Sequence, residues 1–181
     1  MRILRAADRT PTPWKNGGGL TWEVAAWPSG ASLADFEWRA SIAEVGSAGP
    51  FSVFAGVDRV LTVLDGTGLE LRIEGQATVK LDASATPFAF AGDAPCHAVL
   101  INGPVRDFNV MVRRGLWSAQ VQRLEGPAAF RTQADLTLIL ACSPITFDGV
   151  DLRPDDVILI EGSVDAQFAA GTLLAAKLTR A

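Results

Sequence analysis

Histidine and cysteine, which supply many metal ligands and nucleophiles, are scarce in this sequence. Its 181 residues include one histidine, His97, and two cysteines, Cys96 and Cys142. A single histidine lacks the partners that a histidine-based metal site or a Ser-His-Asp triad requires, and no G-x-S-x-G motif is present. The two cysteines lie far apart between apolar neighbours, so buried free thiols are favoured over a disulfide or a thiol nucleophile. We therefore expect no metal and no other cofactor.

Long apolar runs and blocks of like charge are absent as well. The most apolar run, Leu136 to Cys142, is far too short to span a membrane, and residues 1–10 lack the apolar stretch of a signal peptide. We therefore expect a cytoplasmic protein that is not bound to a membrane. The net charge of −4 argues against nucleic acid as a partner.

What the chain does contain is an ordinary globular composition, 49% hydrophobic and 20% charged. A chain of this length buries roughly 70% of its unfolded surface, so it can build a core without disulfides or metals. One domain is expected, or two small halves that share a core.

Short segments with a two-residue alternation of apolar and polar side chains dominate the pattern. They occupy residues 20–27, 36–45, 69–74 and 108–114, and Gly, Pro and Asp separate them. Residues 59–73 are predicted to form a hairpin with its turn at 65–68. Helical periodicity is confined to short pieces near 33–36 and 128–134. The pattern predicts an all-β sandwich or barrel with few short helices.

A faint internal repeat suggests two related β units. "VLTVLDGTGLEL" is followed by "PFAFAGDAPCHAVLI" in the first half, and "LTLILACSPITF" by "DLRPDDVILIEG" in the second. In each half an apolar strand precedes a Gly/Pro-Asp turn that leads into another strand. The predicted organisation is one compact unit, residues 1–181, with a first half at 1–120 and an abbreviated second half at 121–181.

Four longer motifs carry a resemblance to a known family. They are "WKNGGGLTWE" (14–23), the segment 38–71 that begins "WRASIAEV", "FAFAGD" (88–93) and "GPVRDFNVMVRR" (103–114). The chain resembles the HutD/Ves family over essentially its whole length. The resemblance implies a cupin-type β-barrel fold, duplicated as a bicupin, and a link to bacterial histidine utilisation. It also implies a small carboxylate ligand, such as a formylated glutamate, and carries over no catalytic residue.

Many cupins bind a metal through two or three histidines and a glutamate. In this chain "GDAPCH" (92–97) stands where a second cupin motif could fall, and His97 could imitate a ligand there. No second histidine and no suitably spaced glutamate accompany it, so a histidine without a metal is favoured. We expect no bound transition metal.

Polar residues on the predicted strands are the candidates for a ligand site, because a small barrel can hold one ligand inside. Arg39 lies in mid-strand opposite the large apolar residues, and its guanidinium could grip a carboxylate through two hydrogen bonds. Glu23 shares a predicted face with Thr21 and Ala25 on the preceding strand. A structural ion pair between Glu23 and Arg39 and contact with a ligand are left as alternatives.

Two further segments supply candidates. Asp58 and Arg59 lie where a strand begins, and a turn capped by Asp58 that pairs with Arg59 is favoured over ligand contact there. Arg59 stays among the candidates. Asp107, Asn109 and Arg113 alternate on one face of their strand, which is either a ligand wall or a polar exterior. Of these, Asn109 is the predicted ligand-binding residue.

The three consecutive glycines, Gly17 to Gly19, do not form a phosphate-binding loop. A P-loop places its lysine after the glycines and opens a helix, whereas Lys15 precedes them and a strand follows. The glycines predict a close approach of the backbone to neighbouring strands or to a ligand. Lys15 and Asn16 are expected to rim the cavity. Four tryptophans in residues 14–38 are typical of a core or a subunit interface.

Three functions remain open on the sequence alone. The favoured one is a binding protein that is not an enzyme and takes up a small anionic metabolite in a regulatory or accessory role. The second is a metal-independent cupin enzyme, an isomerase or hydrolase, with Glu23 or His97 as base. The third is a protein-interaction module. Exposed strand edges and the tryptophans are compatible with a homodimer.

Overall fold

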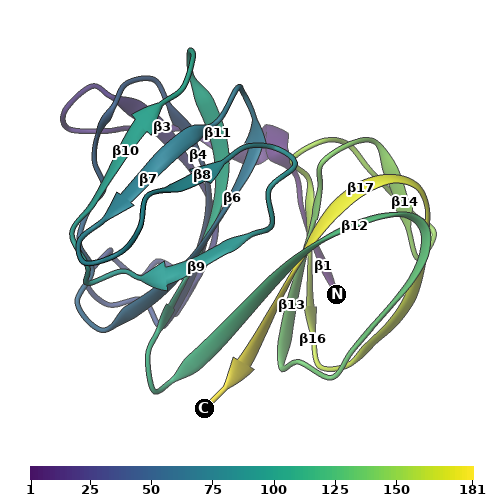
Figure 1. The fold of residues 1–181 in the computed structure, drawn as a ribbon. Helices are drawn as coiled ribbons and strands as arrows, with labels where there is room; N and C mark the ends of the chain where they lie inside the picture. Colours follow the sequence, from purple (N-terminus) through teal and green to yellow (C-terminus); the bar gives the residue numbers. More distant parts are fainter. The chain divides into compact units, whose positions relative to one another are not determined.

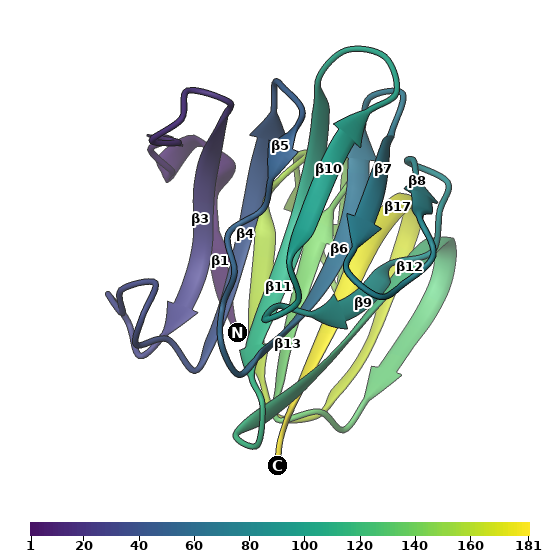
Figure 2. The same cartoon turned by 60° about the vertical axis from the view of Figure 1, so that its left-hand side comes forward.

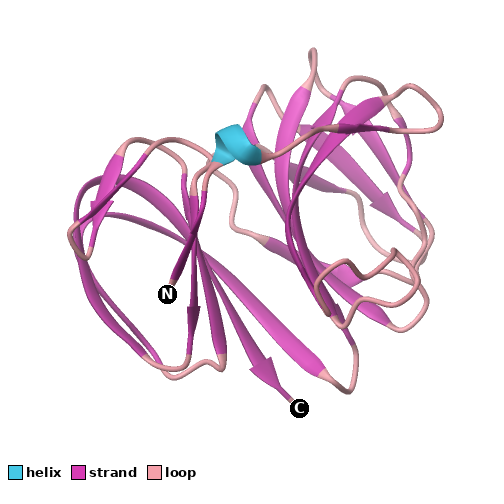
Figure 3. Cartoon of the chain, turned by 180° about the vertical axis from the view of Figure 1, so that it is seen from behind, coloured by secondary structure: helices cyan, strands magenta, loops and turns pink.

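The fold is described by a computed structural model that covers residues 1–181. It is nearly all β, as the sequence predicts, and its one helix is a single 3-10 turn, η1 (Ala6–Asp8), shown in cyan in Figure 3. The predicted helices at 33–36 and 128–134 are wrong. Residues 33–36 form no helix, and residues 128–132 belong to a long strand. No helix of the chain is long or apolar enough to cross a bilayer.

The chain divides into two compact units. One consists of Thr10–Trp117, and the other combines Met1–Arg9 with Ser118–Ala181. The predicted relation between the halves at 1–120 and 121–181 as two related barrels stays a prediction.

Two sheets build the unit of Thr10–Trp117. The six-stranded sheet has the order β2-β3-β4-β11-β6-β9, and the four-stranded sheet the order β5-β10-β7-β8. Figures 1 and 2 both show β10 and β7 in a layer that faces β4, β11 and β6. The strands of the first sheet are β2 (Thr12–Pro13), β3 (Gly19–Trp27), β4 (Trp38–Val45), β11 (Val105–Arg113), β6 (Val57–Asp65) and β9 (Phe88–Ala91). Those of the second are β5 (Gly49–Pro50), β10 (Cys96–Leu100), β7 (Leu69–Ile73) and β8 (Val79–Leu81).

The predicted hairpin at 59–73 is wrong in its pairing, although its strands and turn are placed correctly. β6 pairs with β11 and β9, whereas β7 pairs with β10 and β8. The turn between them carries the chain from one sheet to the other. Gly66 and Gly68 have φ of +99° and +110°, and a Cβ at either would collide with a backbone carbonyl oxygen. Such a turn passes too close to its neighbours for any side chain.

Between the two sheets lies an apolar core. Its buried members come from β6, β7, β8, β9, β10 and β11 and are Leu61, Val63, Leu69, Leu71, Ile73, Leu81, Phe90, Cys96, Ala98 and Val105. The alternation of residues 69–73 matches the prediction, since Leu69, Leu71 and Ile73 are buried while Arg72 is exposed. Cys96 is a buried free thiol of this core, and Cys142 is a half-buried free thiol elsewhere.

The second unit contains one seven-stranded sheet. Its order is β1-β16-β13-β17-β14-β15, with β12 also paired to β17. The N-terminal β1, purple in Figure 1, pairs antiparallel with β16. The strands are β1 (Arg2–Leu4), β16 (Val157–Glu161), β13 (Leu136–Ala141), β17 (Val164–Arg180), β14 (Ile145–Phe147), β15 (Val150–Leu152) and β12 (Trp117–Thr132). Its core includes the fully buried Ile139, Phe147, Ile158 and Leu173.

Candidate functional site

A cavity of about 870 Å³ lies on one face of the six-stranded sheet. Its wall comes from β3, β4, β6 and β11 and from the loops around residues 14–16, 31–33 and 51–54. All six residues that the sequence predicts as ligand-binding line it, namely Lys15, Asn16, Glu23, Arg39, Arg59 and Asn109. Residues that are up to 94 positions apart in the sequence therefore meet at one site.

The strand register explains why these side chains meet. Met111 on β11 stands between Arg39 on β4 and Arg59 on β6. Two residues along, Asn109 stands beside Ser41, whose partner on β3 is Glu23. Because side chains two apart in a strand point to the same face, these rows form one continuous wall.

The next row of the same wall contains Asp107, which pairs with Ala43 on β4 and Val63 on β6. The prediction that Asp107 and Asn109 share a face is therefore confirmed. β3 departs from its predicted alternation, because a register shift falls between Glu23 and Ala25. Ala25 pairs with Ala40 instead of continuing the face of Glu23.

Arg59 is the most unusual group in the cavity. Its side chain is almost fully buried, with 5% of the residue exposed. The guanidinium carbon lies 5.3, 5.7 and 5.1 Å from the ring centres of Phe51, Phe54 and Phe90. Burial lowers the pKa of Arg59 to about 10, so the group stays a cation at neutral pH.

The hydrogen-bonding capacity of this cation is barely used. One Nη1–H donates to the carbonyl oxygen of Ser52 at 3.3 Å, and the buried Nε–H has no partner. A buried donor without a partner destabilises a fold by about 1–3 kcal/mol. Arg59 is thus held by aromatic faces with its donors free for another molecule.

The local pairing predicted for Arg59 is wrong. Asp58 points to the opposite side of β6 and accepts hydrogen bonds from Arg114, at 2.6 Å from Nη2 and 3.0 Å from Nε. Gly92 leaves room for β6, because a Cβ there would lie 2.9 Å from the carbonyl oxygen of Val57 and 3.1 Å from both Cγ and Cδ of Arg59. The lack of space for a side chain at position 92 therefore explains the glycine of "FAFAGD".

Two further buried groups on β11 face the cavity without partners. The Oδ1 atom of Asn109 accepts no hydrogen bond. Asp107 is 2% exposed, and burial raises the pKa of its carboxyl to about 7 while the nearby charge of Arg59 acts in the opposite direction. Asp107 and Arg59 do not form an ion pair within 4 Å. The cavity thus holds a cation, a carboxyl and an amide oxygen that do not satisfy one another.

The structural ion pair between Arg39 and Glu23 is observed, whereas their contact with a ligand stays a prediction. Arg39 Nε donates to Glu23 Oε2 at 2.8 Å, and Nη1 donates to Ser41 Oγ at 3.2 Å. The pair also lines the cavity. The Glu23 side chain is 46% exposed and the Arg39 side chain 12%, so Arg39 is the inner partner. Arg39 has fewer free donors for a ligand than Arg59.

The glycine loop packs against its own strand and against β4. A Cβ on Gly19 would collide with the carbonyl oxygen of Glu44 and lie 3.1 Å from the Trp14 ring. Asn16 Oδ1 accepts the Gly18 N–H at 3.0 Å, and Trp14 Nε1–H donates to Thr21 Oγ1 at 2.7 Å. Of the two alternatives for the glycines, packed neighbouring strands are therefore observed. Asn16 lines the cavity, but its oxygen is engaged in holding the loop.

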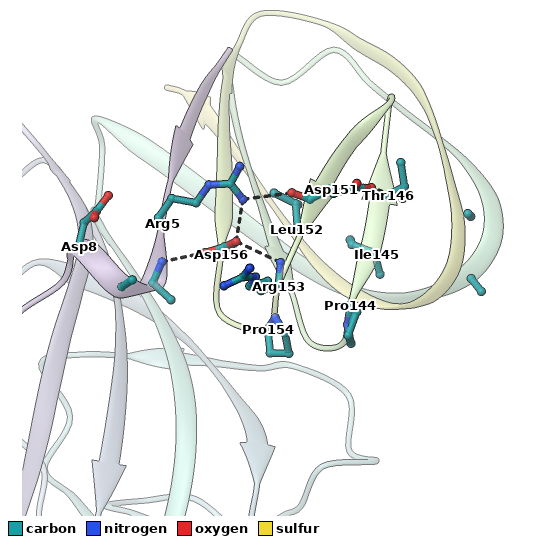
Figure 4. A pocket seen from close by; sticks show the side chains of 14 residues that line it. Arg5, Asp8, Pro144, Ile145, Thr146, Asp151, Leu152, Arg153, Pro154 and Asp156 are labelled. Carbon is teal, nitrogen blue, oxygen red and sulfur yellow. Dashed lines mark hydrogen bonds and ion pairs between the residues drawn. The ribbon is translucent and has the colours of Figure 1, made fainter.

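A second pocket, of about 910 Å³, lies in the unit that combines Met1–Arg9 with Ser118–Ala181 (Figure 4). Two of its charged groups, Arg5 and Asp156, are already paired with each other. Asp156 accepts hydrogen bonds from Arg5 Nη1 at 2.8 Å, from Ala6 N at 2.8 Å and from Arg153 N at 3.0 Å. Asp151 in turn accepts from Thr146 Oγ1 at 2.6 Å. These contacts fix the N-terminal segment to the turn before β16, and they leave little for a ligand.

The residues present do not fit a cupin metal site. No three of the His, Cys, Asp and Glu side chains gather closely enough to hold an ion. His97 is exposed on β10, where it pairs with Pro50 and Arg72, and it is not among the residues that line the cavity. His97 is therefore poorly placed as a base for a ligand bound there.

Sequence reasoning missed two parts of the site. Asp107 was placed on the correct face but not among the ligand-binding residues, because its burial depends on neighbouring strands. Phe51, Phe54 and Phe90 were not connected with Arg59. They come from a loop and from β9, and nothing in their spacing indicates that they surround one cation.

Comparisons with known proteins place the chain in a family. The HutD family model matches residues 6–176. A 21.2 kDa Pseudomonas putida protein, described as an uncharacterized protein in the hutC 3′ region, is 38% identical over 143 residues, which is 79% of this chain and 74% of that protein. Protein Ves of Citrobacter koseri is 41% identical over 60% of this chain and 56% of its own length.

Solved structures agree with these matches. HutD from Pseudomonas fluorescens SBW25 superposes with a TM-score of 0.90 at 35% identity and covers 99% of this chain and 98% of its own. A more distant protein, Ylba from Escherichia coli, has a TM-score of 0.67 at 12% identity over 97% of this chain and 89% of its own, which shows a shared fold. The chain therefore belongs to the HutD/Ves family, as its sequence motifs predicted.

Proposed function

We propose that this protein binds a small anionic metabolite in the cavity of the Thr10–Trp117 unit. The ligand class is a carboxylate that resembles formylglutamate, and the role is regulatory or accessory in histidine utilisation. The link to that pathway comes from the HutD family name and from the Pseudomonas putida relative described by its hutC region. We also propose that the two β units are the halves of a bicupin, for which the internal sequence repeat is the support.

The buried cation of Arg59 carries the proposal. A protein that needed only a stable core would favour an apolar residue here, because burying a charge is costly without a partner. A carboxylate in the cavity would accept hydrogen bonds from the guanidinium Nη groups, whereas the Nε–H is buried. The three phenylalanine faces hold the guanidinium in place before any ligand arrives.

The remainder of the cavity suits a small polar molecule. Its volume of about 870 Å³ lies within the usual range for small-molecule sites, roughly 300–1,000 Å³. The unpartnered Oδ1 of Asn109 can accept a hydrogen bond from a ligand N–H. Lys15 at the rim adds a second positive charge.

A thermal shift screen with purified protein tests the proposal. The compounds are histidine, urocanate, formiminoglutamate, formylglutamate and glutamate. A ligand present at about 100 times its Kd stabilises the folded state by about 2.7 kcal/mol, which is readily measured. We expect at least one dicarboxylate to raise the Tm of the wild type, and the same compound at the same concentration to raise the Tm of Arg59→Met by clearly less.

Arg131→Met is the matched control, because Arg131 is an exposed arginine that pairs with Asp165 within the other unit and does not line this cavity. It should keep the full shift. The absence of any shift across the panel would contradict the proposal and favour an interaction module. If the protein consumed one of the compounds, it would be an enzyme and the proposal of a binding protein would be wrong.

A further inference from the structure

We propose that Asp107 takes up one proton when an anion binds beside Arg59, so that ligand affinity depends on pH through this carboxyl. This inference rests on the proposed function. It names the regulation of the same site and assigns a role to a residue outside the predicted ligand-binding set.

The geometry sets Asp107 apart from the other acidic residues of the chain. Asp107 is 2% exposed, lines the cavity and accepts no hydrogen bond, whereas Asp156, which is similarly buried, accepts three. The ionised Asp107 carboxylate therefore has no hydrogen-bond donor of the protein to stabilise it. Arg59 supplies the opposite charge nearby, without a direct ion pair.

Arg59 is the one charged group whose proximity shifts the pKa of Asp107. Arg39 on β4 is paired with Glu23 on β3. Cys96 on β10 stays a neutral thiol, because burial raises its pKa. Lys15 lies at the exposed rim. Arg59 is therefore the cation that holds Asp107 in its ionised form.

An anion bound at Arg59 removes the electrostatic stabilisation that the guanidinium gives to the Asp107 carboxylate. The ligand carboxylate neutralises the guanidinium and adds a like charge close to Asp107. Both effects favour the neutral acid, so a proton from solvent is transferred to the Asp107 carboxylate as the anion binds. With the pKa of Asp107 at about 7 in the free protein, uptake occurs above that pH. Below it the free protein already carries the proton.

The affinity should fall as pH rises. When the bound form keeps its proton, the association constant drops by about tenfold between pH 6 and pH 8. Formylglutamate is a suitable probe, because its carboxylates stay ionised across this range. The neutral Asp107 can also donate a hydrogen bond from its O–H to a ligand oxygen.

Isothermal titration calorimetry measures both quantities. Formylglutamate is titrated into the wild type at pH 6 and pH 8, and at pH 8 in phosphate and in Tris, whose ionisation enthalpies differ. We expect about tenfold weaker binding at pH 8 and an uptake of about one proton per ligand. Asp107→Asn should bind with nearly the same affinity at both pH values and exchange no proton.

Asp165→Asn is the control carboxylate, because its side chain is 70% exposed and lies in the other unit. It should keep the pH dependence of the wild type. Wild-type binding that is equally tight at pH 6 and pH 8 with no proton uptake would overturn the inference and leave the proposed function standing. Persistent pH dependence in Asp107→Asn would also overturn it. If Asp107→Asn does not fold, the number of protons that the wild type takes up on binding still tests the inference. A lack of binding at both pH values would overturn the proposed function and this inference together.

Discussion

Replacing Asp107 with asparagine should change how the stability of the free protein depends on pH. The pKa of Asp107 is raised by burial from 3.8 to about 7, so the folded state keeps a proton that the unfolded chain has released. Between pH 4 and pH 7 the folded state therefore binds more protons, and wild-type stability falls as pH rises. The elevation corresponds to about 4 kcal/mol of unfolding free energy.

Asparagine has the shape of the protonated acid and does not titrate. The variant should match the wild type near pH 4 and exceed its unfolding free energy by about 4 kcal/mol at pH 7.5, with no further change above that pH. Urea denaturation at five pH values from 4.5 to 8.5 measures the difference. Asp165→Asn should follow the wild-type profile, because Asp165 is exposed. Parallel profiles for Asp107→Asn and the wild type would refute the assignment of a buried, unsolvated carboxyl.

Four further substitutions test the packing around the site and the second pocket. Gly92→Ala should weaken ligand binding and also lower the unfolding free energy, since its Cβ would lie 2.9 Å from the Val57 carbonyl oxygen and 3.1 Å from the Arg59 stem; calorimetry and urea denaturation of the same sample measure the two effects. Gly19→Ala should lower the unfolding free energy by about 1–3 kcal/mol, because the added Cβ overlaps the Glu44 carbonyl oxygen. Gly17→Ala should lower it by only about 1 kcal/mol, since Gly17 has φ of +70° and open space around it. Equal losses would contradict the close approach of Gly19 to the Glu44 backbone. Asp156→Ala should cost about 2–5 kcal/mol, because two backbone N–H groups and Arg5 lose their acceptor, and an unchanged Tm would show that these contacts are dispensable.

The strand pattern predicted much of the site correctly. Period-two alternation put Arg39 and Glu23 on neighbouring strands, and the structure joins their side chains at 2.8 Å. It also placed Asp107 and Asn109 on one face. These successes share a cause, because the face of a side chain within a strand follows from residue parity alone.

The wrong predictions concern strand partners, a bulge and side-chain surroundings, none of which follows from residue parity. The turn at 65–68 has the composition of a hairpin, yet it connects two different sheets, because the partners of each strand are set by distant segments. The face of Ala25 was wrong because a bulge follows Glu23. Arg59 was expected to pair locally, and its aromatic surroundings come from loop and strand residues that only the fold brings together.

A single titration shows whether Arg59 binds a carboxylate in the cavity. Formylglutamate is titrated into the wild type and into Arg59→Met at pH 6, with Arg131→Met as control. Loss of charge-assisted hydrogen bonds worth about 1.5–3 kcal/mol weakens binding by about 10- to 150-fold. We expect that loss of affinity for Arg59→Met and not for Arg131→Met. Equal affinity in the wild type and in a folded Arg59→Met variant would contradict it.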